Sequence, residues 1–242
     1  MGMPITVEIA DSKATVDDFE AIFSYFRSVD EQFSPYKETS EVSRLNRGEL
    51  EEKDYSNEMK EVLSLAAETK KEADGYFDVW HKGKFDPSGI VKGWSIYNAS
   101  KILDARGLLH FYVDAGGDIE VRGKNTEGAL WRVGIRNPFE TSSIIKTLQL
   151  TNCGVATSGT YIRGQHIYNP HSPDSEIKDI VSLTVIGPNV YEADRFATAA
   201  FAMGRGGITF LASLPHLAAY VIDANGIATM TPNFEQFVYN PN

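Results

Sequence analysis

A carboxylate and a hydroxyl stand four residues apart in the last quarter of the chain, at Asp194 and Thr198. Apolar spacing predicts a helix over residues 191–203, which would put both side chains on one face. Carboxylate and hydroxyl oxygens are hard ligands that suit Mg²⁺ or Ca²⁺ better than Zn²⁺. The alternative is that Asp194 only charges the helix start while Thr198 bonds back to the backbone. The pair alone favours that alternative.

A turn of small residues followed by a lysine is the second candidate, in the stretch DPSGIVKGW at residues 86–94. Free N–H groups at a helix start bind phosphate, and Lys92 adds positive charge beside them. Lysine opposes the helix dipole at this end, so a bound anion would compensate it. Alternatively, Asp86 or Ser88 is an ordinary helix cap and Lys92 is solvated. Taken by itself, the segment favours the cap.

Paired glycines at Gly116 and Gly117, in DAGGD, form the third candidate. Glycines let a backbone pass close to a ligand, and they also make tight turns between strands. The pattern alone favours the turn.

Hydroxyl side chains beside a glycine, followed by a histidine, form the fourth candidate. The stretch ATSGTYIRGQHIYNP contains Ser158, Thr160 and His166. The hydroxyls could cradle phosphate oxygens, and His166 titrates near neutrality as a general base should. The alternative is that the hydroxyls serve a strand and the histidine is structural. A zinc site with His171 is weakly supported, because no fourth ligand completes the pattern.

Helices lead, strands follow and mixed elements close the chain, and these elements must position the candidates. The order favours an α+β fold, a single domain over residues 1–242 with a mainly antiparallel sheet flanked by helices. Helices are predicted over residues 16–33, 56–73, 89–107, 191–203 and 206–213. Strands are predicted over residues 5–9, 111–113, 119–121, 131–135, 144–150, 181–186, 219–222 and 227–230.

The composition excludes several classes of protein. With 23 basic and 33 acidic residues the net charge is −10, which counts against nucleic-acid binding. Cys153 is the only cysteine, so no internal disulfide forms, and no apolar run is long enough to be an integral membrane segment. No signal peptide is visible, which predicts a cytoplasmic protein; an extracytoplasmic or membrane-anchored one is the alternative if the N-terminus was trimmed.

Together, the four candidates resemble a known family. The matching stretches, in order, are MGMPITVEI, FSPYKETSEVSRLNRG, FDVWHKGKFDPSGIVKGW, VDAGGDIEVRG, WRVGIRNP, ATSGTYIRGQHIYNP, VSLTVIGP and YEADRFATAAFAMG. They run almost from end to end, and the chain closely resembles the ApbE family of FAD:protein FMN transferases.

The resemblance implies a function. Such enzymes bind FAD, use Mg²⁺ and transfer FMN to a threonine or serine hydroxyl of an acceptor protein, releasing AMP. It implies that Asp194, Thr198 and a backbone carbonyl near Gly89 hold the metal, and that His166 is the base, so that His166 and Asp194 are the catalytic residues. The residues expected to contact FAD are Asn46, Asp86, Ser88, Lys92, Gly116, Gly117, Ser158, Thr160 and His166.

The chain departs from the family pattern after the histidine. Asn169 replaces the usual aspartate, and His171-Ser172-Pro173 replaces the basic-Thr-Gly that follows. Two alternatives to the transferase therefore stay open. One is a Mg²⁺-dependent FAD pyrophosphatase that yields FMN and AMP, and the other is a non-catalytic FAD-binding protein.

Overall fold

The computed structural model describes residues 2–160 and 167–241. Its helices are α1 (Val16–Phe33), α2 (Glu41–Asn46), α3 (Asn57–Glu72), α4 (Ser88–Ala105), α5 (Val190–Ala202) and α6 (Gly206–Ala212), with 3₁₀ turns at Glu52–Asp54 and Glu235–Phe237. Its strands are β1 (Ile5–Ile9), β2 (Trp80–His81), β3 (Lys84–Phe85), β4 (Phe111–Ala115), β5 (Asp118–Arg122), β6 (Trp131–Arg136), β7 (Ile144–Leu150), β8 (Cys153–Gly159), β9 (Ile180–Gly187), β10 (Ala218–Asp223) and β11 (Ala228–Met230).

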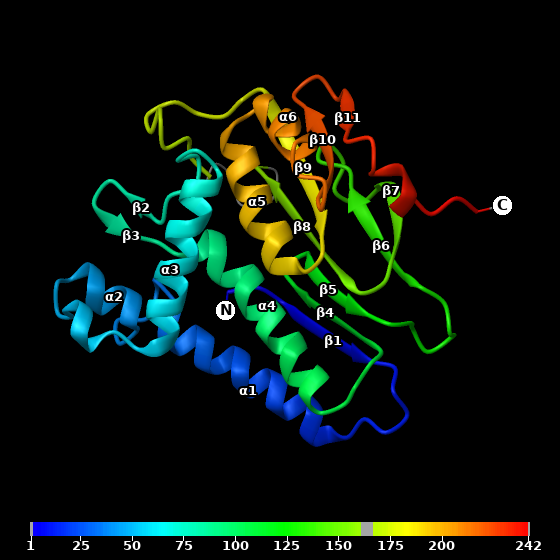
Figure 1. Ribbon diagram of the computed structural model, residues 1–242, viewed down its shortest axis with the longest axis horizontal. Helices are drawn as coiled ribbons and strands as arrows, with labels where there is room; N and C mark the ends of the chain where they lie inside the picture. The colour runs from blue at the N-terminus through cyan, green and yellow to red at the C-terminus, as the bar shows by residue number, and fades with distance from the viewer. Residues whose placement is uncertain (1, 161–166, 242) are drawn as a thin grey trace.

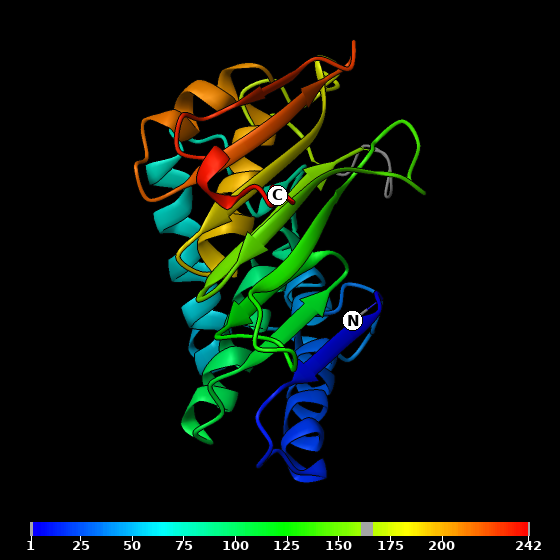
Figure 2. The ribbon, with the colours of Figure 1, turned by 90° about the vertical axis from the view of Figure 1, so that its right-hand side faces the viewer.

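One twisted sheet organises the molecule. In the described part of the chain it has seven strands in the order β1-β4-β5-β8-β9-β10-β11, and all neighbours pair antiparallel. Helices α1, α4 and α5 cover one face, while hairpin β6–β7 packs on the other (Figures 1 and 2). The architecture confirms the predicted α+β class with a mainly antiparallel sheet.

Alternation along β5 decides which side chains face the helices. Ile119 and Val121 pack against hairpin β6–β7. Asp118 and Glu120 therefore point to the helix face, where both are almost fully buried. Two buried carboxylates in the middle of a sheet need hydrogen-bond or ionic partners, and the helices that cover this face supply some of them.

Strand β8 is a difference from the sequence-based expectation, which assigned no strand to residues 153–159. The strand lies in the centre of the sheet between β5 and β9. Its sequence CGVATSG is poor in large apolar residues, so the usual strand signal is weak. Small residues are required because α5 packs closely on this strand, and burial of the neighbouring elements stabilises it.

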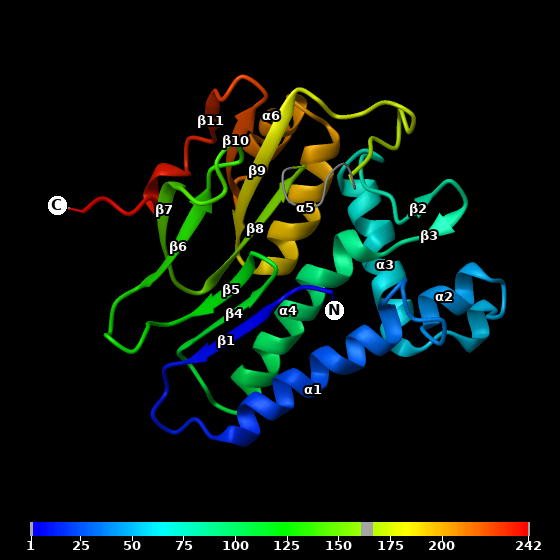
Figure 3. The same ribbon diagram turned by 180° about the vertical axis from the view of Figure 1, so that it is seen from behind.

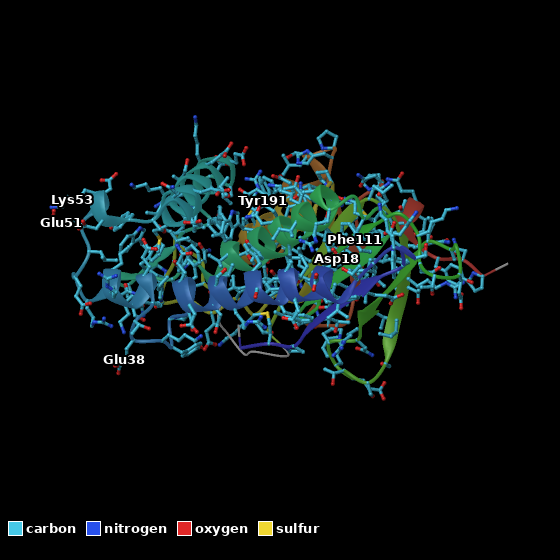
Figure 4. All side chains as sticks on the ribbon, turned by 90° about the horizontal axis from the view of Figure 1, so that it is seen from below. Asp18, Glu38, Glu51, Lys53, Phe111 and Tyr191 are labelled. Carbon is cyan, nitrogen blue, oxygen red and sulfur yellow. The ribbon has the colours of Figure 1, made fainter. Side chains whose placement is uncertain are left out.

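Helices α2 and α3 lie beside the sheet, apart from α6, which packs on α5 and β10. Helices α2 and α3 and the short hairpin β2–β3 lie on the opposite side of the molecule from the β6–β7 hairpin (Figures 1 and 3). Helix α1 runs along this side, from the turn that contains Asp18 towards the loop with Glu51 and Lys53 (Figure 4). Within the described residues, no helix is both long and apolar enough to cross a membrane.

Candidate active site

Most of the candidate residues meet in one cavity of about 190 Å³. It lies where the β4–β5 turn and the end of β8 approach α5 and the start of α4. The predicted residues that line it are Asp86, Ser88, Gly89, Lys92, Gly116, Ser158, Asp194 and Thr198. They come from segments more than a hundred residues apart in the chain, so the fold itself assembles them.

Asp194 and Thr198 lie on the same face of α5, as their spacing predicts, and both line the cavity. Asp194 is 3% exposed, and its Oδ2 accepts a hydrogen bond of 2.7 Å from the backbone N–H of Gly93 in α4. A Cβ on Gly89 would lie 3.3 Å from the Thr198 methyl group, so Gly89 and Thr198 are in contact. The three predicted metal-binding positions are therefore neighbours.

Lys92 stands between two buried carboxylates. Its Nζ lies 2.5 Å from Oδ2 of Asp118 and 3.5 Å from Oδ1 of Asp194. Asp118 was not among the sequence-predicted site residues, although it ends the DAGGD stretch. A carboxylate directly after paired glycines, at the start of a buried strand, was the signal that could have identified it.

The charges of this group do not cancel. Burial raises the pKa of Asp194 above its usual range, and the nearby Asp118 carboxylate raises it further. The Lys92 ammonium and the Gly93 N–H oppose that rise in pKa. With both carboxylates ionised, one ammonium leaves a net negative charge in a buried place. Such a site favours a cation.

The turn that joins β4 to β5 is a tight one. Gly116 and Gly117 have φ values of +67° and +96°, in the left-handed region that favours glycine. Asp114 Oδ1 accepts the Gly117 N–H at 2.8 Å. The two glycines make the tight turn that the pattern favoured. They also lie where a ligand could contact the backbone, since Gly116 lines the cavity and Gly117 lines a second, adjoining cavity.

Some predicted contacts lie outside the cavity lining. The side chain of Asn46 exchanges two hydrogen bonds with the backbone of Phe85, of 2.8 and 2.7 Å, and so ties α2 to β3. Thr160 follows β8, and its N–H donates to Val181 O at 3.4 Å. His166 lies outside the described residues. The FAD contacts assigned to these three residues stay predictions, as do those assigned to the residues that line the cavity.

Helix α4 does not have the cap that the sequence offered as an alternative: Pro87 occupies the N-cap position, and no side chain caps the helix. Asp86 Oδ1 accepts the Ser88 N–H at 3.0 Å. Asp86, Ser88 and Gly89 nevertheless line the cavity. The Asp86–Ser88 hydrogen bond therefore stabilises the turn that leads into α4, at the wall of the cavity.

Aromatic side chains that the sequence analysis did not single out form another wall of the cavity, at Tyr76, Phe77, His81 and Tyr168. The rings of His81 and Tyr168 lie with their centroids 3.8 Å apart. The Tyr168 hydroxyl donates to Asp78 O at 2.8 Å and lies 3.2 Å from Trp80 O, which ties this wall to the start of hairpin β2–β3. A planar ring system would find stacking partners here.

The residues after His166 that depart from the family pattern form a turn. Asn169 Oδ1 accepts the His171 N–H at 2.9 Å, and His171 Nε2 lies 2.8 Å from Asp74 O. Neither Asn169 nor His171 lines the cavity in the described part of the structure. The amide of Asn169 stabilises the turn in the way that an aspartate at the same position could.

A comparison with known families agrees with this arrangement. The model of the ApbE family matches residues 1–83 and 80–221. The chain belongs to the ApbE family. The matched ranges contain every residue placed in the cavity above.

Relatives of this ApbE chain include a curated enzyme and solved structures. The FAD:protein FMN transferase of Escherichia coli K12 is 27% identical over 165 residues, 63% of this chain and 47% of that protein. The flavin transferase ApbE from Vibrio cholerae has a TM-score of 0.83 at 22% identity, covering 98% of this chain and 96% of that chain. The ApbE protein from Thermotoga maritima has a TM-score of 0.87 at 21% identity, covering 99% and 97%.

These comparisons differ in what they establish about ApbE function here. The solved structures share the fold along nearly the whole chain. The sequence match, by contrast, spans about half the length of the Escherichia coli relative.

Proposed function

We propose that this protein transfers FMN from FAD to a threonine or serine hydroxyl of an acceptor protein and releases AMP. The observation that carries the proposal is the convergence of Lys92, Asp194 and Thr198 on one cavity beside the start of α4. Cleavage of a diphosphate depends mainly on positioning and on neutralising phosphate charge. A lysine, a helix N-terminus and hard oxygen ligands supply both. The name of the Escherichia coli relative supports the same reaction.

The donor set fits Mg²⁺. Asp194 and Thr198 offer a carboxylate and a hydroxyl, and Gly89 offers a backbone carbonyl. Within the described residues, no cluster of three or more His, Cys, Asp or Glu side chains forms a cage for a metal. Mg²⁺ prefers such incomplete sites, where one or two carboxylates are supplemented by water and substrate phosphates. When bound, it would neutralise the charge of the diphosphate and of the departing AMP.

The residues of the chain would act on the two substrates as follows. Lys92 and the N–H groups at the start of α4 bind the FAD diphosphate. His166, on the resemblance, accepts the proton of the acceptor hydroxyl. The hydroxyl oxygen bonds to the phosphorus of the FMN half while the bond from that phosphorus to the bridging oxygen breaks. AMP leaves with the bridging oxygen, so the reaction needs no further reactant.

The two adjoining cavities together suit a ligand as long as FAD. The first, of about 190 Å³, is smaller than the roughly 300–1,000 Å³ of typical ligand pockets. The second, of about 830 Å³, shares Gly116 and Thr157 with it. We infer that the diphosphate lies in the first cavity and that FAD extends beyond it. Ser158 and the Gly116–Gly117 turn would then contact FAD along its length.

The test is to incubate the protein with FAD, Mg²⁺ and candidate acceptors and to weigh the acceptors by mass spectrometry. A mass gain equal to one FMN phosphoester, with one AMP formed per acceptor, supports the transferase. AMP and free FMN formed equally well without any acceptor would assign the pyrophosphatase instead. Stoichiometric FAD binding without AMP, in every acceptor mixture and with Mg²⁺ present, would assign a binding protein.

A further inference from the structure

Asp118 is close to the site but does not reach the cavity. It is 1% exposed and is absent from the lining of both cavities, whereas Lys92 and Asp194 line the first. Two cavity-lining side chains lie next to it: Lys92, whose Nζ is 2.5 Å from Asp118 Oδ2, and Asp194, whose pKa the Asp118 carboxylate raises. A residue so placed can influence a bound substrate only through another side chain.

The backbone of the central sheet holds Asp118 in place. Its Oδ1 accepts the Thr157 N–H of β8 at 3.1 Å, and the residue begins β5, next to β8 in the sheet. Its Oδ2 has no hydrogen-bond partner of good geometry among the described residues. This oxygen forms an ion pair with the Lys92 ammonium. One carboxylate oxygen is thus anchored to the sheet and the other is directed at the lysine.

A lysine needs such an anchor because its side chain has four flexible carbons. The Lys92 ammonium lies 3.5 Å from the Asp194 carboxylate, a looser contact than the 2.5 Å to Asp118. Asp194 is also needed as a metal ligand in the proposed function. Asp118 leaves Asp194 free for that role while it keeps Lys92 directed at the cavity.

We propose that Asp118 is a positioning residue that fixes the Lys92 ammonium against the FAD diphosphate. The inference rests on the proposed function for the identity of the ligand. Asp118 lies outside the cavity, so it acts on FAD through a neighbouring side chain. In this proposal that side chain is Lys92. The Asp118 carboxylate also lies near Asp194, whose pKa it raises.

The experiment is a double-mutant cycle with Asp118→Asn, Lys92→Met and the double variant. Asparagine keeps an oxygen for the Thr157 N–H but turns an uncharged amide to Lys92. FAD affinity is measured from flavin fluorescence with Mg²⁺ present, and turnover from AMP formation. We expect Asp118→Asn to weaken FAD binding at least about 5-fold in the native background and less than about 2-fold in the Lys92→Met background.

A matched control is Asp18→Asn. Asp18 also pairs with a cation at 2.5 Å, the Arg106 guanidinium, but outside both cavities. This control should leave FAD affinity unchanged. Asp118→Glu, which keeps the charge, should recover part of the lost affinity.

Additivity would overturn the proposal. If Asp118→Asn weakens FAD binding equally with and without Lys92, Asp118 acts on the ligand, the metal or the fold directly. Thermal unfolding of each variant shows whether the fold is retained. If the native protein binds FAD but forms no AMP, the proposed function fails, while the affinity cycle still decides the role of Asp118.

Discussion

The backbone N–H of Gly93 donates to the Asp194 carboxylate at 2.7 Å, across 101 residues of sequence. The bond joins α4 to α5 at the cavity and fixes the carboxylate that the proposed function needs. Such close contact requires glycine, because a Cβ at position 93 would lie 2.6 Å from the Asp194 Cβ and 2.9 Å from Val190 O. The residue type at position 93 therefore sets the position of Asp194.

Replacing Gly93 with alanine should displace Asp194. We expect AMP formation to fall about 10–100-fold, because small misplacements of catalytic groups have large effects on rate. The free energy of unfolding should fall by about 1–3 kcal/mol, as in other overpacked sites. Steady-state kinetics and chemical denaturation measure the two effects.

The control for this variant is Gly206→Ala. Gly206 begins α6, and its added Cβ would come no closer than 4.0 Å to the Met203 Cβ. Its free energy of unfolding should change by less than about 0.5 kcal/mol. Equal activity losses in the two variants would contradict the steric explanation.

Asp194→Asn should separate metal binding from folding. Loss of the carboxylate should lower AMP formation at least about 100-fold, since a metal supplies several kcal/mol of transition-state stabilisation. Without metal, the variant should be at least as stable as the native protein, because a buried charge is removed. Melting temperatures with and without Mg²⁺ should show stabilisation of the native protein only. An active variant that Mg²⁺ stabilises normally would remove Asp194 from the metal site.

Glu120 should make stability depend on pH. It is fully buried on β5, and its Oε2 accepts the Val190 N–H of α5 at 2.5 Å. Burial raises its pKa from 4.5 to about 7, against the lowering effect of Arg122. The folded state thus binds this proton more tightly than the unfolded state does, so the free energy of unfolding falls as pH rises between about 4.5 and 7.

Glu120→Gln should remove this contribution. Denaturation curves of the native protein and the variant, measured from pH 4 to 8, give the difference in unfolding free energy. As pH rises, the unfolding free energy of the native protein should fall relative to that of the variant, by up to about 3 kcal/mol in total. Asp194 titrates in both proteins and largely cancels in the comparison. A difference that does not vary with pH would show that Glu120 has an ordinary pKa in the folded state.

The contribution of Asp18 to stability should have the opposite pH dependence. Its Oδ2 accepts the Thr15 N–H at 2.7 Å as part of the capping box at the start of α1. The Arg106 guanidinium and the Thr15 contacts lower its pKa from 3.8 to about 2. The stabilisation is thus present above pH 3.8 and is lost as pH falls to about 2. Asp18→Asn should lower the melting temperature at pH 7 but not at pH 2, and FAD affinity should not change.

Local patterns in the sequence were enough to predict every α-helix of the described residues except the short α2, and most strands. The spacing of Asp194 and Thr198 also placed them on one helix face, because helical geometry alone brings residues i and i+4 together. The order of motifs indicated the family. Each of these inferences depends on residues that are near one another in the chain.

The tertiary structure decided the contacts between distant segments. Strand β8 was missed because its small and polar residues are accepted only where α5 packs on it. Asp118 joined the site because its register on β5 turns it towards Lys92, and Asp194 is fixed by the backbone of Gly93. These pairings depend on the order and register of the strands and on how closely two helices approach. No local pattern of residue types determines those distances, because they result from the packing of the whole sheet and its helices.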